Sequence, residues 1–244
     1  MSNHHFEVER RAEMNIRRWL STEHAAGHRK PPHDDESVGP YVTISREVGA
    51  GGCAIARGVG RELGWEVLDR EIINVMADRY GMPHETVELL DEKHPTWIED
   101  WFASMFAGQR STGSSFIYRL KRTLLLAGQH GNVVIVGRGA QFILPRDRGI
   151  SVRILAPRDF RVEQVLLQKG ISEREASKYV DDHDRQHEQF TREFLHHDAT
   201  DPHMYDLVIN VEKLVVADAV RLIVDATRAW LLNSTDARAT RVSA

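Results

Sequence analysis

Short apolar runs alternate with longer amphipathic segments through most of the chain. The first run, residues 41–44, leads into a glycine-rich stretch, and helical periodicity then extends from residue 54 to 63 before Gly64 ends it. Further apolar runs lie at residues 65–68, 133–136, 152–155 and 207–211. Strands that alternate with helices predict an α/β fold of three layers, with a central five-stranded parallel sheet covered on both faces.

The two ends of the chain follow a different pattern. Residues 6–20 have rough helical spacing, and residues 28–40 are polar and contain prolines, which predicts a helical appendage and linker over 1–39. This arm could dock on its own domain or on a second copy, which would give a homo-oligomer. The main domain is predicted over 40–232, with a disordered tail at 233–244.

A long charged segment near residues 170–203 contains few large apolar side chains. Ser172 and Glu175 have the spacing of a capping box, so a helix is expected to begin there. A helix of this composition projects from a core more readily than it lies inside one. We expect it to form a helical lid.

Composition narrows the classes of function. With 244 residues and 41% hydrophobic content the chain can bury one sizeable core, and a formal charge of −4 provides no general attraction to nucleic acid. Residues 1–30 contain no continuous apolar stretch, which indicates neither a secretory signal nor a membrane span. Cys53 is the single cysteine, so an internal disulfide is impossible, and a cytoplasmic setting is predicted.

The glycine loop, residues 45–54, is the main candidate for chemistry. It leaves a strand, turns through Gly49, Gly51 and Gly52, and enters a helix, which points successive backbone N–H groups into one small volume. The helix N-terminus adds roughly half a positive charge, so a phosphate group fits there. The predicted phosphate-binding residues are Ser45, Arg46, Gly49, Ala50, Gly51, Gly52, Cys53 and Ala54.

Three interpretations of this loop remain open: a P-loop, a dinucleotide site read as Gly49-x-Gly51-x-x-Ala54, and a turn without a ligand. The polar insert at residues 45–47 favours the P-loop, because a dinucleotide-binding strand runs almost directly into its first glycine. The P-loop signature places lysine and a hydroxyl where this chain has Gly52 and Cys53. Another cation would have to act, and the candidates are Arg46, Arg57 and Arg138.

Four segments together resemble the cytidylate kinase-like family, a divergent branch of the P-loop nucleoside monophosphate kinases. They are ISREVGAGG at 44–52, LDREII at 68–73, VIVGRGA at 134–140 and DPHMYDLVIN at 201–210, and the resemblance covers about residues 41–230. It implies transfer of the γ-phosphoryl of ATP to a nucleoside monophosphate or another small phosphorylated acceptor. It also implies Mg²⁺ held mainly by the nucleotide phosphates, with no resident metal.

The resemblance also implies roles for individual residues. Asp69 and Arg138 match residues that hold the acceptor, whereas Gly139 stands where an aspartate would help to recognise cytosine. His187 occupies a lid position where arginine is usual, and we expect it to be partly charged near neutral pH. The residues that match the lid pattern or the arginines around the transferring phosphoryl group are Arg161, Asp184, Arg185 and Arg192.

Two further alternatives follow from the same residues. Gly52, Cys53, Gly139 and His187 all depart from the catalytic pattern, which favours as second hypothesis a catalytically impaired nucleotide-binding or regulatory module on the same fold. His183 and His187 lie on one helical face, as metal ligands can, but two histidines one turn apart more often form a polar surface.

Overall fold

The computed structural model describes residues 7–15, 39–79 and 113–242. Its contacts divide the chain into two compact units, Met1–Pro31 with Glu71–Ala127 and Pro32–Arg70 with Gly128–Ala244. The predicted domain of residues 40–232 stays a prediction, with residues 71–127 grouped apart from the rest of it. Most of the predicted linker, residues 16–38, lies outside the described ranges.

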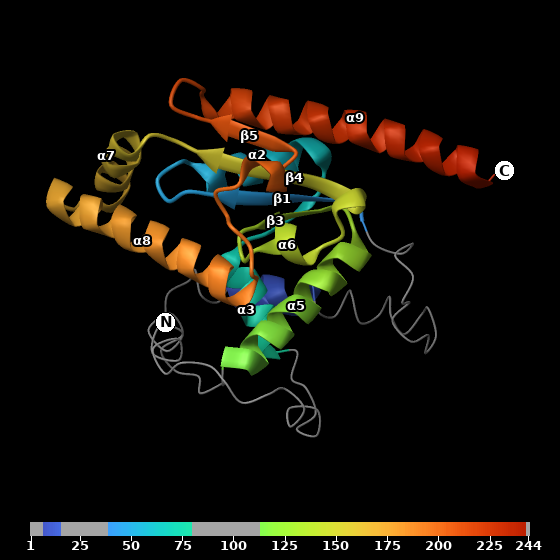
Figure 1. The fold of residues 1–244 in the computed structure, drawn as a ribbon, viewed down its shortest axis with the longest axis horizontal. Helices are drawn as coiled ribbons and strands as arrows, with labels where there is room; N and C mark the ends of the chain where they lie inside the picture. Colours follow the sequence, from blue (N-terminus) through green and yellow to red (C-terminus); the bar gives the residue numbers. More distant parts are fainter. Residues whose placement is uncertain (1–6, 16–38, 80–112, 243–244) are drawn as a thin grey trace. The chain divides into compact units, whose positions relative to one another are not determined.

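The second unit contains a five-stranded parallel sheet in the order β2-β3-β1-β4-β5. Strands β3, β1, β4 and β5 are labelled in Figure 1. Each strand overlaps an apolar run predicted from the sequence, and the five-stranded parallel sheet confirms the predicted fold class. The strands are β1 (Tyr41–Arg46), β2 (Glu66–Leu68), β3 (Val133–Val136), β4 (Gly149–Leu155) and β5 (Leu207–Asn210).

The strand order distinguishes between the interpretations of the glycine loop. Strand β1 lies at the centre, between β3 and β4, and β2 lies at the edge beyond β3. A dinucleotide-binding fold would pair β1 with β2 directly. The dinucleotide interpretation is therefore wrong, and the loop that follows β1 opens at the middle of the sheet.

Strand β1 extends two residues beyond the predicted run, because β4 continues beside it and supplies ladder partners. Ser45 lies opposite Arg153, and Arg46 lies opposite Ile154. The next N–H, that of Glu47, still donates to the carbonyl of Ile154 at 3.0 Å. Ser45 and Arg46 of the glycine loop are thus strand residues, and the turn itself begins at Glu47.

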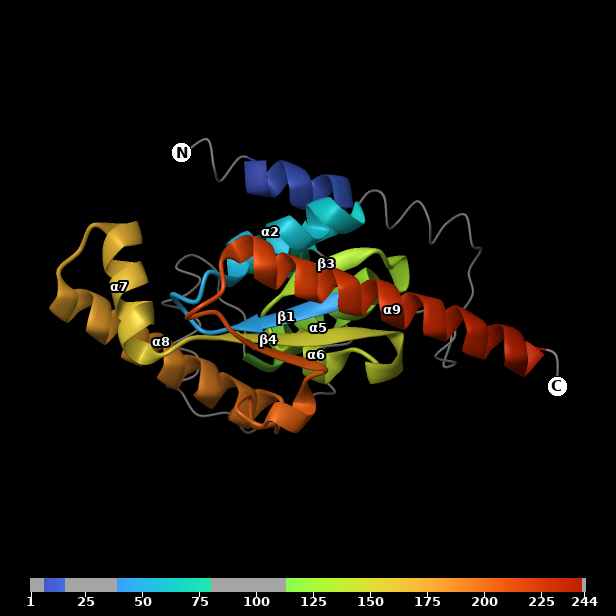
Figure 2. The same cartoon turned by 90° about the horizontal axis from the view of Figure 1, so that it is seen from above.

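Helices α2 (Gly52–Leu63) and α9 (Val216–Val242) lie side by side over one face of this sheet (Figure 2). Their buried side chains join those of β1, β3 and β4 in one apolar core, represented by Ile44, Ile55 and Ile223. Helix α9 includes residues 233–242, which belong to the tail at 233–244 that was predicted to be disordered. The core fixes α2, and with it the helix end that follows the glycine loop.

Helices α7 (Arg158–Lys169) and α8 (Glu173–Phe194) form a hairpin with a small apolar cluster of its own. Val162 and Val165 of α7 pack there with Ala176 and Val180 of α8. The capping box is confirmed, since Ser172 accepts from the Glu175 N–H and the Glu175 carboxylate accepts from the Ser172 N–H. Of the charged segment at residues 170–203, predicted as a lid, the 22 residues of α8 form one continuous helix.

Short elements complete the second unit. Helix α6 (Ala140–Ile143) follows β3, and the 3-10 helices η3 (Arg146–Arg148) and η4 (Pro202–Met204) precede β4 and β5. No helix among the described residues is long and apolar enough to cross a membrane.

The described part of the first unit is helical. It comprises residues 7–15 and most of α3 (Arg70–Arg79) and α5 (Gly113–His130). Val8 and Ala12, one turn apart, are both buried. The N-terminal appendage is thus a helix with one packed face over the residues described.

Gly58 allows the close approach of α2 to α9. A β-carbon placed there would lie 2.5 Å from Cγ2 of Val220, which is closer than carbon atoms pack. We expect Gly58→Ala to lower the free energy of unfolding by about 1–2 kcal/mol, because overpacking outweighs the better helix propensity of alanine. Chemical denaturation would measure this.

The exposed position Glu62→Ala on the same helix is the control, and it should leave stability nearly unchanged. Adding Val220→Ala to Gly58→Ala should recover part of the loss, because it removes the methyl groups that collide. Strictly additive losses in the double variant would contradict this account of the helix contact.

Candidate active site

The glycine loop presents backbone donors at the N-terminus of α2. Gly51 is the N-cap residue, with φ of 72°, and Gly52 and Cys53 are the first helical residues. The N–H groups of Gly51, Gly52 and Cys53 have no acceptor within the described ranges, as expected at a helix start. Those of Ala50 and Ala54 donate within the loop, to the carbonyls of Glu47 and Gly51. The N–H groups of two predicted phosphate-binding residues, Ala50 and Ala54, are thus already engaged.

Glu47 ties this loop to the neighbouring strand. Its Oε2 accepts from the Ala156 N–H at 3.2 Å and lies 3.3 Å from Nε of Arg161, while Oε1 accepts from Nη2 of Arg153 at 3.2 Å. An unpaired carboxylate in the glycine loop would repel a phosphate group there. Here two guanidinium groups neutralise it.

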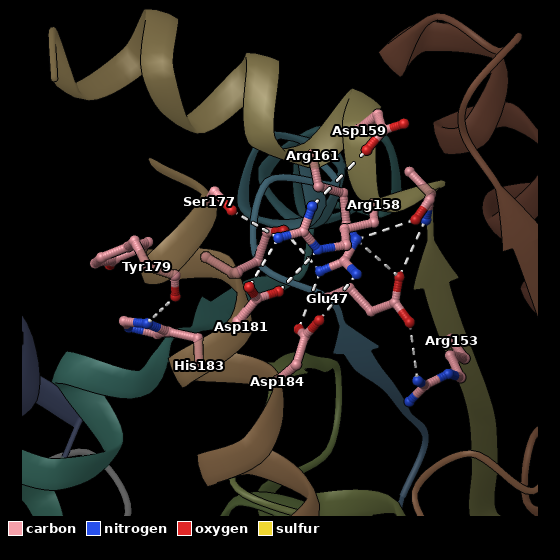
Figure 3. Close-up of polar contacts among 12 residues, drawn as sticks. Glu47, Arg153, Arg158, Asp159, Arg161, Ser177, Tyr179, Asp181, His183 and Asp184 are labelled. Carbon is pink, nitrogen blue, oxygen red and sulfur yellow. Dashed lines mark hydrogen bonds and ion pairs between the residues drawn. The ribbon is translucent and has the colours of Figure 1, made fainter. Parts of the chain in front are cut away.

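Arg161 joins the loop to the lid helix (Figure 3). Its Nη1 and Nη2 donate to the two carboxylate oxygens of Asp184 at 3.0 and 2.9 Å, and its Nε donates to the carbonyl of Ala156 at 3.0 Å. The Arg161 side chain is only 7% exposed, and that of Asp184 is 32% exposed. The structure thus brings these two predicted site residues together, but as partners of each other.

The other two predicted lid arginines lie apart from this cluster. Arg185 is 73% exposed and pairs with Asp182 on its own helix, with 3.6 Å between Nη1 and Oδ1. Arg192 is also exposed, two turns further along α8. Arg185 and Arg192 therefore do not lie in one cluster with Arg161.

Asp69 and Arg138 follow neighbouring strands, β2 and β3, at the carboxyl edge of the sheet. Asp69 is half-buried, and Arg138 is buried with a positive φ of 57°. Next to Arg138, a β-carbon on Gly139 would overlap Cδ1 of Leu195, the residue that ends α8. Leu195 therefore occupies the space that an aspartate at position 139 would need.

His187 of α8 is neutral at physiological pH. Removal from water, followed by the nearby charges of Arg46 and Arg153, lowers its pKa from 6.5 to about 4. The expectation of a partly charged histidine near pH 7 is therefore wrong. Burial beside two guanidinium groups, which sequence spacing does not reveal, is the reason.

His183 has a separate environment one turn earlier. Its Nδ1 lies 2.9 Å from the carbonyl oxygen of Tyr179, and its ring lies against the Tyr179 ring with 3.9 Å between centroids. Desolvation is the main cause of its lowered pKa. Across the described ranges, no three His, Cys, Asp or Glu side chains converge as metal ligands.

Magnesium fits this loop only through a bound nucleotide. Cys53 is exposed where the P-loop signature has a hydroxyl, and a thiol is a poor ligand for this hard cation. The nearby carboxylates of Glu47 and Asp184 are occupied by arginines. Ser45 is buried, and its hydroxyl has no hydrogen-bond partner within the described part of the chain.

Sequence reasoning missed three residues of this site: Glu47, Arg153 and Leu195. Arg153 is the charged side chain of a mainly apolar strand, and its Cζ lies 5.7 Å from the centroid of the Tyr205 ring. A charged residue in such a strand and an acidic residue in the glycine loop were the signals in the sequence that Arg153 and Glu47 could pair. Nothing in the sequence marked Leu195.

The contact between Arg161 and Asp184 should contribute measurably to stability. We expect Asp184→Asn to lower the free energy of unfolding by about 2 kcal/mol, because it leaves a buried guanidinium with one acid partner fewer. Denaturant titration would measure the change.

The same helix supplies a matched control in Asp181, which pairs with Arg158 at 2.7 Å on the exposed side of the hairpin. Asp181→Asn should leave the free energy of unfolding nearly unchanged, since exposed pairs are screened by water. Equal effects at the two positions would show that burial does not distinguish them.

The neutral His187 predicts a pH dependence of stability. Its folded pKa lies below its unfolded pKa, so the unfolded chain takes up a proton first as the pH falls. Above pH 6.5 this effect does not reduce the free energy of unfolding. Between pH 6.5 and about 4, the free energy of unfolding falls by up to roughly 3 kcal/mol because of His187. The difference in unfolding free energy between wild type and His187→Gln, measured across this range, isolates it. A difference that does not vary with pH would contradict the assignment.

Comparison with known proteins shows what the chain is similar to. Cytidylate kinase from Pyrococcus horikoshii is 25% identical over 173 residues, which span 70% of this chain and 80% of that protein. Cytidylate kinase from Methanopyrus kandleri is 24% identical over 187 residues, or 72% and 87% of the two chains. The crystal structure of an uncharacterized protein from Eubacterium ventriosum superposes with a TM-score of 0.58 and 20% identity, covering 76% of this chain and 96% of that one.

A family model locates the similarity along the sequence. The model of the cytidylate kinase-like family matches residues 41–213, which is more than half of the chain and runs from β1 to just beyond β5. The chain therefore belongs to the cytidylate kinase-like family.

Proposed function

We propose that the chain transfers the γ-phosphoryl of ATP to a nucleoside monophosphate, in the manner of a cytidylate kinase, or to another small phosphorylated acceptor. Membership of the family supports the coarser statement, a nucleotide kinase-type phosphotransferase. Two relatives named as cytidylate kinases support the nucleotide acceptor.

One observation carries the proposal. Among the residues that the structure describes, the N–H groups of Gly51, Gly52 and Cys53 have no acceptor at the N-terminus of a twelve-residue helix, which follows the central strand through the glycine loop. Such a helix end stabilises an anion through directed donors and through its partial positive charge. A phosphate of ATP is the anion that this family would supply.

Arg138 and Asp69 are the proposed acceptor-binding residues. They follow adjacent strands at the edge of the sheet where the glycine loop opens, and a guanidinium fork matches the oxygens of a phosphate in pairs. Because Leu195 fills the space beside Gly139, the base of an acceptor would have to be recognised by other groups. The acceptor should therefore be sought among several bases and among small phosphorylated metabolites.

The proposed contribution of the lid is to gather positive charge and exclude water. Arg161 and Asp184 hold α8 against the glycine loop, so Arg161 acts here by positioning the lid. Arg185 and Arg192 are exposed, and they would contact a transferring phosphoryl group only after a movement of α8.

The activity itself is tested by a coupled phosphotransfer assay with ATP and Mg²⁺. CMP, dCMP, UMP, AMP and a set of small phosphorylated metabolites would serve as acceptors, and ATP binding would be measured in parallel by calorimetry. The proposal predicts turnover with at least one acceptor. Tight ATP binding without turnover on any acceptor would instead favour the nucleotide-binding or regulatory module, which the absence of a P-loop lysine already suggests.

Arg138→Ala tests the acceptor site separately. We expect the KM for the acceptor to rise by about 10- to 100-fold, because one charge-assisted contact to phosphate is lost, while the Kd for ATP stays within about threefold. The control is Arg146→Ala, an exposed arginine on η3 whose Nη2 donates to the carbonyl of His203. An equal loss of affinity for ATP and acceptor would contradict the assigned role.

A further inference from the structure

At two positions of the glycine loop, Arg46 and Gly52, this chain has a cation where the P-loop signature has glycine and a glycine where the signature has its cation. That signature has glycine at its first position and lysine directly after its second glycine, six residues further on. With Gly51 as the second glycine, the first position holds Arg46 and the lysine position holds Gly52. The loop therefore has a cation and a glycine, each in the place of the other.

The structure shows that the two substitutions depend on each other. A β-carbon placed on Gly52 would lie 2.6 Å from Cβ and 2.7 Å from Cγ of Arg46. The stem of Arg46 thus crosses the backbone at the position from which a lysine side chain would leave. Position 52 accepts only glycine while Arg46 keeps this path.

The guanidinium of Arg46 reaches the end of β3. A β-carbon on Gly137 would lie 2.6 Å from Nη1 of Arg46, and the N–H of Gly137 is itself held by the carbonyl of Ile44 at 2.9 Å. The charged group therefore lies between the carboxyl ends of β1 and β3, beside the helix start with its unsatisfied amides. Bound phosphates would occupy this region under the proposed function.

Arg46 also differs from its neighbours in having no acid partner among the described residues. Arg153 pairs with Glu47, and Arg161 pairs with Glu47 and Asp184. Within the part of the chain that the structure describes, no carboxylate pairs with the half-buried Arg46, and its charge is one cause of the lowered pKa of His187. An uncompensated, partly buried cation is stabilised by an anion that arrives with a ligand.

We propose that Arg46 takes over the role of the missing P-loop lysine and contacts the outer phosphates of the bound nucleoside triphosphate. This inference rests on the proposed function and assigns the cation that the proposed reaction requires. The guanidinium donates to non-bridging oxygens of the β- and γ-phosphates, and its fork allows a paired contact that lysine does not make. Gly52 serves as the gap through which the arginine stem passes.

The test compares ATP and AMP binding by calorimetry. Arg46→Ala should weaken ATP binding by about 10- to 100-fold and AMP binding by less than about threefold, because AMP has no outer phosphates. Arg46→Lys keeps the charge and most of the stem and should lose less. The matched control is Arg61→Ala, an exposed arginine in the last turn of α2, which should leave both affinities unchanged.

A reciprocal swap tests the exchange directly. The double variant Arg46→Gly with Gly52→Lys restores the order of residues in the usual signature, and it should bind ATP within about tenfold of wild type. Gly52→Lys alone should bind ATP more weakly than the double variant, because the lysine collides with the stem of Arg46. Thermal melting of each variant verifies that it is folded.

The outcomes separate this inference from the proposed function. If wild type binds ATP and Arg46→Ala binds it equally well, the inference about Arg46 is wrong and the proposed function stands. Equal losses for ATP and AMP would also overturn it, since they would indicate damage to the whole loop. Failure of wild type to bind ATP would overturn both proposals.

Discussion

A buried guanidinium must have acid partners, and in this protein that requirement fixes the candidate active site. Arg161 receives its partners from two separate places, Glu47 in the glycine loop and Asp184 on the lid helix. The backbone of the glycine loop also lies close to the backbone of α7, since a β-carbon on Gly49 would lie 2.5 Å from the carbonyl oxygen of Arg161. The positions of the glycine loop and of α8 are therefore coupled through the Arg161 side chain. A change at Glu47 or at Asp184 alters the contacts that Arg161 makes with the other.

The same network determines the charge of the loop. Glu47 and Asp184 contribute two negative charges, and Arg46, Arg153 and Arg161 contribute three positive ones, so one positive charge is left over beside the N-terminus of α2. Because His187 is held neutral, it neither adds to this charge nor competes for an anion. A loop without the signature lysine can in this way still present a cation and free amides to phosphate.

The sequence predicted what depends on short-range patterns. Five apolar runs became the five strands, and the capping box of Ser172 and Glu175 formed as expected, because both follow from residues within a few positions of one another. The extension of β1 to Arg46 could not be predicted in this way, because it depends on β4, which lies more than 100 positions away in the sequence.

The same limit applies to the site. Arg161 and Asp184 were both predicted as functional residues, but their pairing requires the turn between α7 and α8, and the pairing of Arg161 with Glu47 requires the sheet. The neutral state of His187 and the filling of the space beside Gly139 by Leu195 depend equally on tertiary packing. Residue types therefore indicated the chemistry, and only the fold decided which groups are engaged with one another.

The central claim is that the start of α2 binds a phosphate of the nucleotide. Nuclear magnetic resonance of the backbone amides during titration with ATP tests it most directly, because hydrogen bonding to phosphate shifts the resonance of the donor. The account predicts the largest shifts at the amides of Gly51, Gly52 and Cys53, with little change at Ala54, whose N–H already donates to Gly51. Saturation by ATP that leaves those three resonances in place would contradict it.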